Sequence, residues 1–202
     1  MHPNPAFGWT DQKAMLDFAA DQSFAHIFTA SGSGQFVVHA PLLVRQGRIL
    51  FHVARRNRIA GELEGREVLI SILGRHAYQS ANWYMSQDQV PTWHYEAVEI
   101  EGVARRVSDE ELVALIDQLT DVMEERFSPD HPWTRAKMGA GKFEAMTKAI
   151  LGFEVEPREI RGTRKFNQHK SEEDLEATIK GQRSAGREDI VDAIEEIRLR
   201  GK

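Results

Sequence analysis

Two neighbouring segments of the chain, residues 36–45 and 48–54, alternate between apolar and other side chains with the period of a β-strand. Side chains on one face of such a strand pair point the same way, so an entirely apolar face has to be buried. We therefore predict that one face of this pair lines the interior of a β-barrel. That face consists of Val38, Ala40, Leu42, Val44, Ile49, Phe51 and Val53.

The opposite face of the pair mixes apolar residues with two histidines. A two-residue hairpin turn at Gln46-Gly47 would set Pro41 opposite His52 and His39 opposite Ala54. The two imidazoles would then be diagonal neighbours, about 7–8 Å apart. Such a mixed face suits a cleft or a subunit interface better than bulk solvent.

The remaining pattern predicts a mostly β protein of the α+β class with flanking helices. Further strands are expected over residues 24–30, 67–74 and 153–160, and another long strand ends near residue 107. Residues 75–84 are interpreted as an aromatic and polar loop. Helices are predicted after Thr10, over residues 56–65, after the capping-box pattern Ser108/Glu111, over residues 142–151, after Ser171, and over residues 188–200.

The change of character after residue 162 sets the expected domain organisation. Residues 1–162 are predicted to form the barrel domain with its inserted helices. Residues 163–202 add a basic segment and a helical C-terminal appendage to that same domain. A chain of 202 residues is long enough to bury one substantial core.

Composition narrows the classes of function. The formal net charge of −5 argues against autonomous, non-specific DNA binding, and the absence of cysteine excludes disulfides and thiolate metal sites. The apolar stretches are too short to cross a bilayer, and the N-terminus shows no signal peptide. We therefore expect a cytoplasmic protein without a membrane partner.

Familiar catalytic motifs are missing from the sequence. It has no Walker phosphate loop, no dinucleotide-binding glycine pattern and no nucleophile elbow. His39 and His52, with His94 or Glu96 as a third ligand, would be the best metal candidate. Imidazoles that form hydrogen bonds in a half-buried cleft are the preferred interpretation, so no metal is expected.

The end of the second hairpin strand carries several cations. Arg55, Arg56 and Arg58 surround Asn57 directly before the predicted helix, whose N-terminus would add free backbone N–H groups. Arginine supplies bidentate donors to anions, so a phosphate would fit here. A solvated basic helix start is the alternative that the spacing leaves open.

Aromatic residues gather between residues 78 and 93. Tyr78, Trp83, Tyr84 and Trp93 lie within this stretch. Their rings could stack on a planar ring system or form the aromatic centre of a dimer interface. Both interpretations hold if a cofactor lies between subunits.

These segments together resemble the PaiB-like, FMN-binding negative transcriptional regulators. In two positions the chain departs from that family's pattern: Ala81 replaces the usual proline of the aromatic loop, and His94 replaces the usual asparagine after Pro-Thr-Trp. The matching stretches are residues 39–42, 51–57, 74–84, 90–95, 150–155 and 165–170.

The resemblance implies an FMN-binding split β-barrel, related to the pyridoxamine phosphate oxidase flavoproteins. It also implies a homodimer with FMN at or near the subunit interface, the phosphate toward Arg55 and the isoalloxazine over the face with the two histidines. Catalytic residues are not identified. The cofactor-binding residues implied by the resemblance are His39, His52, Ala54, Arg55, Asn57, Arg58, Tyr78, Gln79, Ser80, Trp83, Lys165 and Gln168.

Three functions follow from this resemblance. The first is negative regulation of transcription, acting on DNA directly or through a regulatory protein partner. The second is a flavin-dependent oxidoreductase for a small molecule, with His39, His52 or Tyr78 as proton donor. The third is a flavin- or haem-related binding module without turnover.

Overall fold

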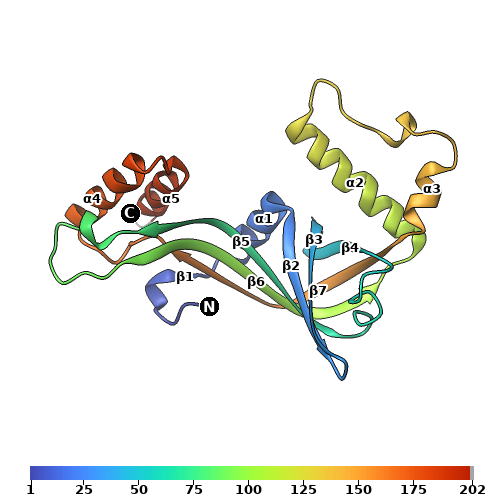
Figure 1. Cartoon of the computed structure of the whole chain (residues 1–202), viewed down its shortest axis with the longest axis horizontal. Coiled ribbons are helices and arrows are strands. Elements are labelled where there is room, and N and C mark those ends of the chain that lie inside the picture. The colour runs from blue at the N-terminus through green and yellow to red at the C-terminus, as the bar shows by residue number, and fades with distance from the viewer. Residues whose placement is uncertain (201–202) are drawn as a thin grey trace. The chain divides into compact units, whose positions relative to one another are not determined.

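The structure is a computed structural model that describes residues 1–200 and forms a mostly antiparallel sheet with flanking helices, labelled in Figure 1. The strands are β1 (Gly8–Trp9), β2 (Phe24–Ser31), β3 (Gly34–Arg45), β4 (Arg48–Ala54), β5 (Glu67–Gln79), β6 (Thr92–Arg106) and β7 (Ile150–Lys165). The helices are α1 (Gln12–Gln22), α2 (Asp109–Phe127), α3 (Lys142–Thr147), α4 (Glu172–Ser184) and α5 (Glu188–Arg200).

Six of these strands close into a barrel. The sheet order is β1-β7-β4-β3-β2-β5-β6, and an additional pairing of β7 with β6 joins the two ends of the six-stranded part. At this closure Gly102 of β6 approaches β7 so closely that a Cβ atom would lie 2.5 Å from the backbone oxygen of Glu156. A side chain at this position would therefore push the two strands apart.

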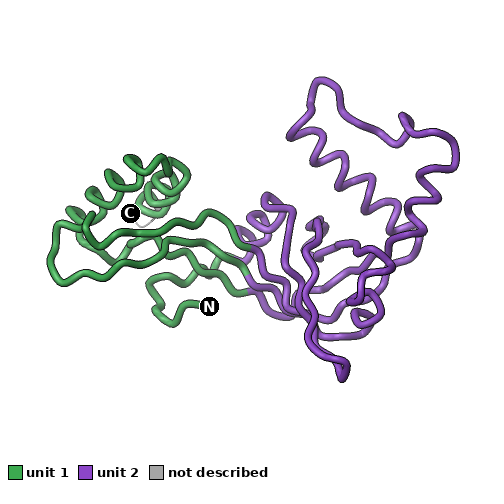
Figure 2. Tube along the Cα trace, in the orientation of Figure 1, with its two compact units in different colours: residues 1–11, 73–98, 161–202 green, residues 12–72, 99–160 purple. Residues whose placement is uncertain are grey.

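The chain divides into two compact units, each of which is described by itself (Figure 2). The barrel unit comprises residues 12–72 and 99–160. The terminal unit comprises residues 1–11, residues 73–98 and the chain from Arg161 onward. The predicted domain boundary after residue 162 stays a prediction.

The barrel interior contains the apolar face predicted from the hairpin. Six of its seven residues are buried, and Val44 is half-buried. The turn pairs Arg45 with Arg48, as a two-residue hairpin requires. Alternation with period two is therefore the signal that placed the core correctly.

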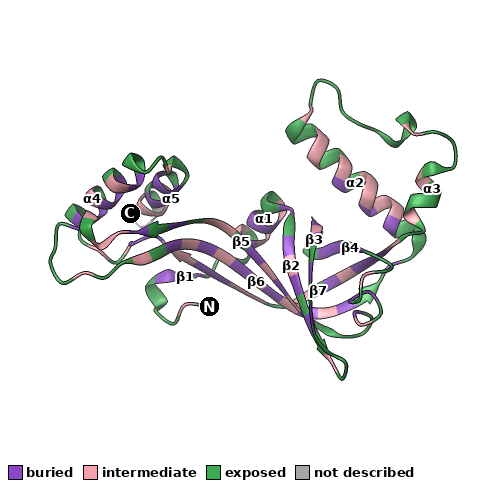
Figure 3. Cartoon of the chain, in the orientation of Figure 1, coloured by how far each residue is buried: buried purple, intermediate pink, exposed green. Residues whose placement is uncertain are grey.

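Helix starts were also well predicted. The side chain of Ser108 accepts a hydrogen bond from the Glu111 N–H, and the Glu111 carboxylate accepts one from the Ser108 N–H, so α2 begins with a capping box. Figure 3 shows that α2 buries one side and exposes the other. Leu112 and Leu115 on the buried side pack with Leu50 and Val107 of the barrel unit.

The predicted helix over residues 56–65 is wrong. The chain forms a series of turns there, held by hydrogen bonds from the N–H of Asn57 to the Ala54 oxygen and from the N–H of Ala60 to the Asn57 oxygen. The Asn57 side chain accepts a hydrogen bond from the Ile59 N–H, at 3.1 Å. This local bond competes with helical pairing and favours a turn.

The boundaries of three other elements also differ from the prediction. β5 continues to Gln79 through the predicted loop, β7 extends in both directions to Ile150 and Lys165, and α3 ends at Thr147. Residues 75–79 are mostly polar or aromatic, which favoured a loop assignment, but the terminal unit supplies hydrogen-bond partners for Arg75 and Gln79. Among residues 1–200, no helix has the length and apolar character needed to cross a membrane.

Candidate functional site

The predicted cofactor-binding residues fall into two sets of six. The barrel unit contains His39, His52, Ala54, Arg55, Asn57 and Arg58, and the terminal unit contains Tyr78, Gln79, Ser80, Trp83, Lys165 and Gln168. Each set has its own surroundings.

The segment 54–58, called here the arginine turn, joins the end of β4 to the following turns. Arg55 Nε donates to the Lys148 carbonyl oxygen at 2.9 Å, so its side chain already binds the segment between α3 and β7. The guanidinium of Arg58 donates to the Gln35 oxygen at 3.1 Å and lies 4.6 Å from the centre of the Phe36 ring. The arginine turn is thus anchored on two sides.

Arg56 is exposed, as are Arg55 and Arg58, and it differs from them in its contacts. Within the described residues its side chain has no hydrogen bond or ion pair, and the backbone N–H groups of Arg56 and Arg58 donate to no group of the chain. The helix N-terminus that was expected to supply N–H groups is absent, but the turn itself leaves such donors open. Guanidinium groups together with open N–H donors suit the oxygens of an anion.

His39 lies on an exposed outer face of the barrel, formed by β2, β3 and β5. The ladder sets it directly opposite His26, and the two imidazole rings are 4.7 Å apart. We call the outward-facing residues of these strands the outer sheet face: Phe24, His26, Phe28, Val37, His39, Leu69 and Ser71.

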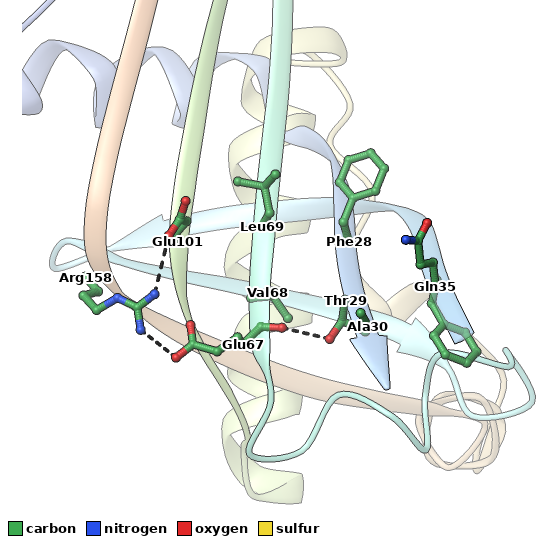
Figure 4. A pocket seen from close by; sticks show the side chains of 10 residues that line it. Phe28, Thr29, Ala30, Gln35, Glu67, Val68, Leu69, Glu101 and Arg158 are labelled. Atoms are coloured by element: carbon green, nitrogen blue, oxygen red, sulfur yellow. Dashed lines mark hydrogen bonds and ion pairs between the residues drawn. The ribbon is translucent and has the colours of Figure 1, made fainter. Parts of the chain in front are cut away.

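A pocket of about 400 Å³ opens at one end of this region (Figure 4). Phe28 and Leu69 line it from neighbouring strands. At its rim Arg158 donates to the carboxylates of Glu67 at 2.6 Å and Glu101 at 3.4 Å. An apolar floor with a paired cation at the rim can hold an apolar group from a ligand or a partner.

The structure does not bring His52 beside His39 in a shared ladder. In the described residues, pairing between β3 and β4 ends at Leu42 and Phe51, so the expected pairs Pro41/His52 and His39/Ala54 do not form. β3 continues along β2 instead, and Ala54 pairs with Ile150 of β7. The barrel strands diverge here, which the hairpin pattern could not show.

Gln79 is fully buried in the terminal unit and belongs to a polar network. His94 Nε2 lies 2.9 Å from Gln79 Oε1, and the Gln182 amide donates to the same oxygen at 3.3 Å. The Gln79 amide donates to Thr178 Oγ1 and to the Ser80 carbonyl oxygen. Its side chain is therefore occupied by internal partners.

His94 connects this network to β7. Its Nδ1 lies 3.3 Å from the Lys165 carbonyl oxygen, and its ring stacks on Phe166. Burial lowers the pKa of His94 to about 4, so the imidazole is neutral at pH 7. A neutral imidazole carries one N–H and can donate to only one of its two oxygen neighbours.

Trp83 and Tyr78 have different surroundings. The Trp83 ring packs against Gly181 of α4, where a Cβ atom would lie 2.3 Å from the indole, so this side chain is committed to the terminal unit. Tyr78 is half exposed, and its ring contacts that of exposed Trp93 edge to face at 6.0 Å. Ser80 accepts a hydrogen bond from the Asn82 N–H and begins a short 3-10 helix.

The last two predicted residues have local roles. Lys165 Nζ donates to Thr92 Oγ1 at 2.5 Å, and burial lowers the pKa of its ammonium group. Gln168 accepts a hydrogen bond from the Phe166 N–H and donates to the carbonyl oxygens of Arg164 and Ala6. Both side chains hold the end of β7 against neighbouring segments.

A buried charge cluster was missed at the sequence level. Glu96, only 2 % exposed, lies 2.7 Å from Arg75 Nε and 3.3 Å from Arg164 Nε. Strict alternation along β6 was the available signal, because it places His94 and Glu96 on the same buried face as Val98. Among residues 1–200, no three or more His, Cys, Asp or Glu side chains are grouped so that they could hold a metal ion.

Comparison with known proteins identifies similar sequences. A family model described as "Putative FMN-binding domain" matches residues 1–159. "Protease synthase and sporulation protein PAI 2" from Bacillus subtilis strain 168 is 30 % identical over 175 residues, covering 83 % of this chain and 82 % of that protein. The family match confirms the prediction of FMN as cofactor.

Solved structures show the same fold at low sequence identity. The flavocytochrome Anf3 from Azotobacter vinelandii has a TM-score of 0.58 at 16 % identity, covering 82 % of this chain and 72 % of that one. The FAD and heme binding protein from Mycobacterium smegmatis has a TM-score of 0.58 at 13 % identity, covering 84 % and 79 %. The predicted split-barrel fold class is confirmed.

Proposed function

The chain belongs to the FMN-binding domain family that matches residues 1–159, and from this premise we propose that the arginine turn holds the phosphate of FMN. The observation that carries this proposal is the set of open donors in the described turn, which are the Arg56 guanidinium and the backbone N–H groups of Arg56 and Arg58. Arg55 acts differently, because its guanidinium is bonded to the Lys148 oxygen and fixes the turn in place. Asn57 shapes the turn through its bond to Ile59.

The flavin ring is proposed to lie on the outer sheet face, near His39. Support comes from Arg58, because its guanidinium donates to the Gln35 oxygen and lies over the Phe36 ring, near the start of the same strand that carries His39. When bound, FMN supplies reversible electron and hydride transfer. The chain contributes the His26/His39 pair, whose ring nitrogens can orient or protonate a group beside the ring.

A homodimer with FMN at its interface is proposed from the exposure of the same face. Phe28 and Val37 are paired neighbours on β2 and β3 and are 40 % and 46 % exposed, and Phe24 on the same face of β2 is 52 % exposed. Contiguous exposed apolar groups of this kind mark interaction surfaces. Sedimentation should give twice the 23.0 kDa chain mass.

Removal of one side chain that binds the phosphate should lower the affinity for FMN and leave the affinity for riboflavin unchanged. Arg56→Ala is expected to weaken FMN binding by at least about tenfold, because a charge-assisted hydrogen bond is lost. Riboflavin binding should not change, since riboflavin carries no phosphate. Flavin fluorescence titration of both ligands measures the two affinities.

Arg105→Ala is the matched control, because Arg105 is also an exposed arginine of the barrel unit without a partner in the described residues. It should leave both affinities unchanged. If Arg56→Ala and Arg58→Ala both bind FMN as tightly as the natural chain does, the phosphate lies elsewhere and the proposal is wrong.

The biological role that we propose is negative regulation through a partner protein, in the cytoplasm. The similarity to a protein named for protease synthesis and sporulation supports a regulatory role. The net charge of −5 argues against direct contact with DNA. A gel-shift assay at low salt should show no binding by the FMN-loaded protein; salt-dependent binding would point to direct contact instead.

The exposed His26/His39 pair favours one alternative, a flavin-dependent oxidoreductase for a small molecule. An ionisable pair at the proposed ring position could transfer a proton to a substrate. Rapid oxidation of NADH or NADPH by the FMN-loaded protein would support this alternative. Absence of reduction would favour a binding module that senses flavin.

A further inference from the structure

A second pocket of the barrel unit lies on the outer side of β4, away from any ladder that contains His39. Its volume is about 320 Å³, and its walls come from β4, α2, α3 and the segment between the two helices. Aromatic and sulfur-containing side chains dominate the walls. The residues that matter here are His52, Ile116, Trp133, Met138, Phe143 and Ile150.

The wall between α2 and α3 is held in place by several bonds. The backbone N–H of Trp133 donates to Glu124 Oε2 at 2.7 Å, and Arg135 forms an ion pair with Asp117 at 3.2 Å. The Arg135 guanidinium also lies 5.2 Å from the centre of the Phe143 ring. These contacts tie the connecting segment to both helices, so the pocket has a defined shape.

His52 is the titratable group in this apolar wall. Its Nδ1 is buried and has no hydrogen-bond partner in the described structure. Burial lowers the pKa of His52, so the ring stays neutral in the neutral pH range. A buried polar atom without a partner is costly, and such atoms often mark a missing ligand or water.

We infer that this pocket is a second ligand site, which takes a small, flat aromatic molecule carrying one N–H or O–H group that bonds to the His52 imidazole. The volume is within the range of small-molecule sites. Trp133 and Phe143 offer ring faces, and Met138 offers an adaptable sulfur contact. The inference does not depend on the proposed FMN site.

This pocket lies next to the segment that anchors the arginine turn, and that position suggests a use for the site. Arg55 Nε bonds the Lys148 oxygen, and the Arg55 N–H donates to the Ala149 oxygen at 2.8 Å. The next residue, Ile150, lines the pocket. A ligand that shifts this wall would therefore act directly on a residue that anchors the turn.

Two nearly isosteric probes test the inference. Indole carries an N–H donor and benzothiophene does not, and calorimetry measures the binding of each to the natural protein with and without saturating FMN. Indole should bind several-fold to tenfold more tightly than benzothiophene, as one hydrogen bond predicts. FMN should compete with neither probe.

Variants show whether His52 is the residue that bonds to indole and whether both probes occupy this pocket. His52→Phe should remove the advantage of indole while benzothiophene still binds, and Ile116→Trp should fill the pocket and abolish both. Val122→Ala, at an exposed position of the same helix, is the control and should change neither affinity. Unchanged far-UV circular dichroism shows that each variant is folded.

Three results would overturn the inference. Equal affinity for the two probes, or an indole advantage that survives in His52→Phe, excludes the hydrogen bond to His52. Loss of both probes on addition of FMN assigns the pocket to the flavin ring. If the protein binds no FMN, the probe titrations without FMN still decide the matter, so the two proposals fail separately.

Discussion

Replacement of Glu96 by glutamine is expected to lower the free energy of unfolding by about 3 kcal/mol or more. The Glu96 carboxylate is 2 % exposed and lies between the guanidinium groups of Arg75 and Arg164. Arg164 in turn lies 3.5 Å from the centre of the Trp9 ring. Without the carboxylate charge, the half-buried guanidinium groups of Arg75 and Arg164 would each lose a buried ion-pair partner.

Urea unfolding measures this loss, and Glu196→Gln is its control. Glu196 binds the same Arg75 at 3.0 Å, but its side chain is 45 % exposed. Water screens that pair, so its loss should cost less than about 1 kcal/mol. Equal losses in the two variants would show that burial does not set the strength of this cluster.

His94 is expected to make stability depend on pH between about 4 and 6.5. Its pKa is about 4 in the folded protein against an ordinary value of 6.5, so the unfolded chain takes up the proton first as the pH falls. The contribution is fully present above pH 6.5 and is lost as the pH drops toward 4. That shift corresponds to about 3 kcal/mol.

His94→Asn isolates this effect, because asparagine does not titrate and can still bond to Gln79. The free energy of unfolding, measured by urea at several pH values, should fall less steeply for this variant between pH 6.5 and 4. His52 and His169 also have pKa values lowered by burial. The contribution of His94 is therefore the difference in the free energy of unfolding between the natural chain and the variant at each pH. Identical slopes would contradict the assignment.

The stability of the terminal unit is therefore set by polar and charged side chains that bond to internal partners. Gln79 and Trp83 were predicted to contact FMN, yet each is committed to internal partners, His94 and Gly181. Such positions hold segments of the terminal unit in place. The resemblance identifies these residues as characteristic of the family, and their contact with FMN stays a prediction.

Short-range patterns were enough for much of the fold. Period-two alternation predicted the interior of β3 and β4, and the Ser108/Glu111 pair predicted the start of α2. Both signals depend on contacts between residues close in the chain, where spacing determines which side chains meet. The same reasoning failed over residues 56–65, because one asparagine side chain bonded to its own turn and replaced the expected helix.

By itself, the sequence determined the barrel strands, the family and hence FMN, since these are properties of local alternation and of ordered motifs along the chain. Only the tertiary structure decided which polar side chains are available to a ligand. Arg55, Arg56 and Arg58 look equivalent in sequence, but distant carbonyl oxygens at Lys148 and Gln35 occupy two of them and leave Arg56 free. His39 and His52 separate for the same reason: the ladder between β3 and β4 ends at Leu42 and Phe51, so His39 pairs along β2 and His52 along β7. Partner choice between segments far apart in the chain depends on packing, which spacing alone does not encode.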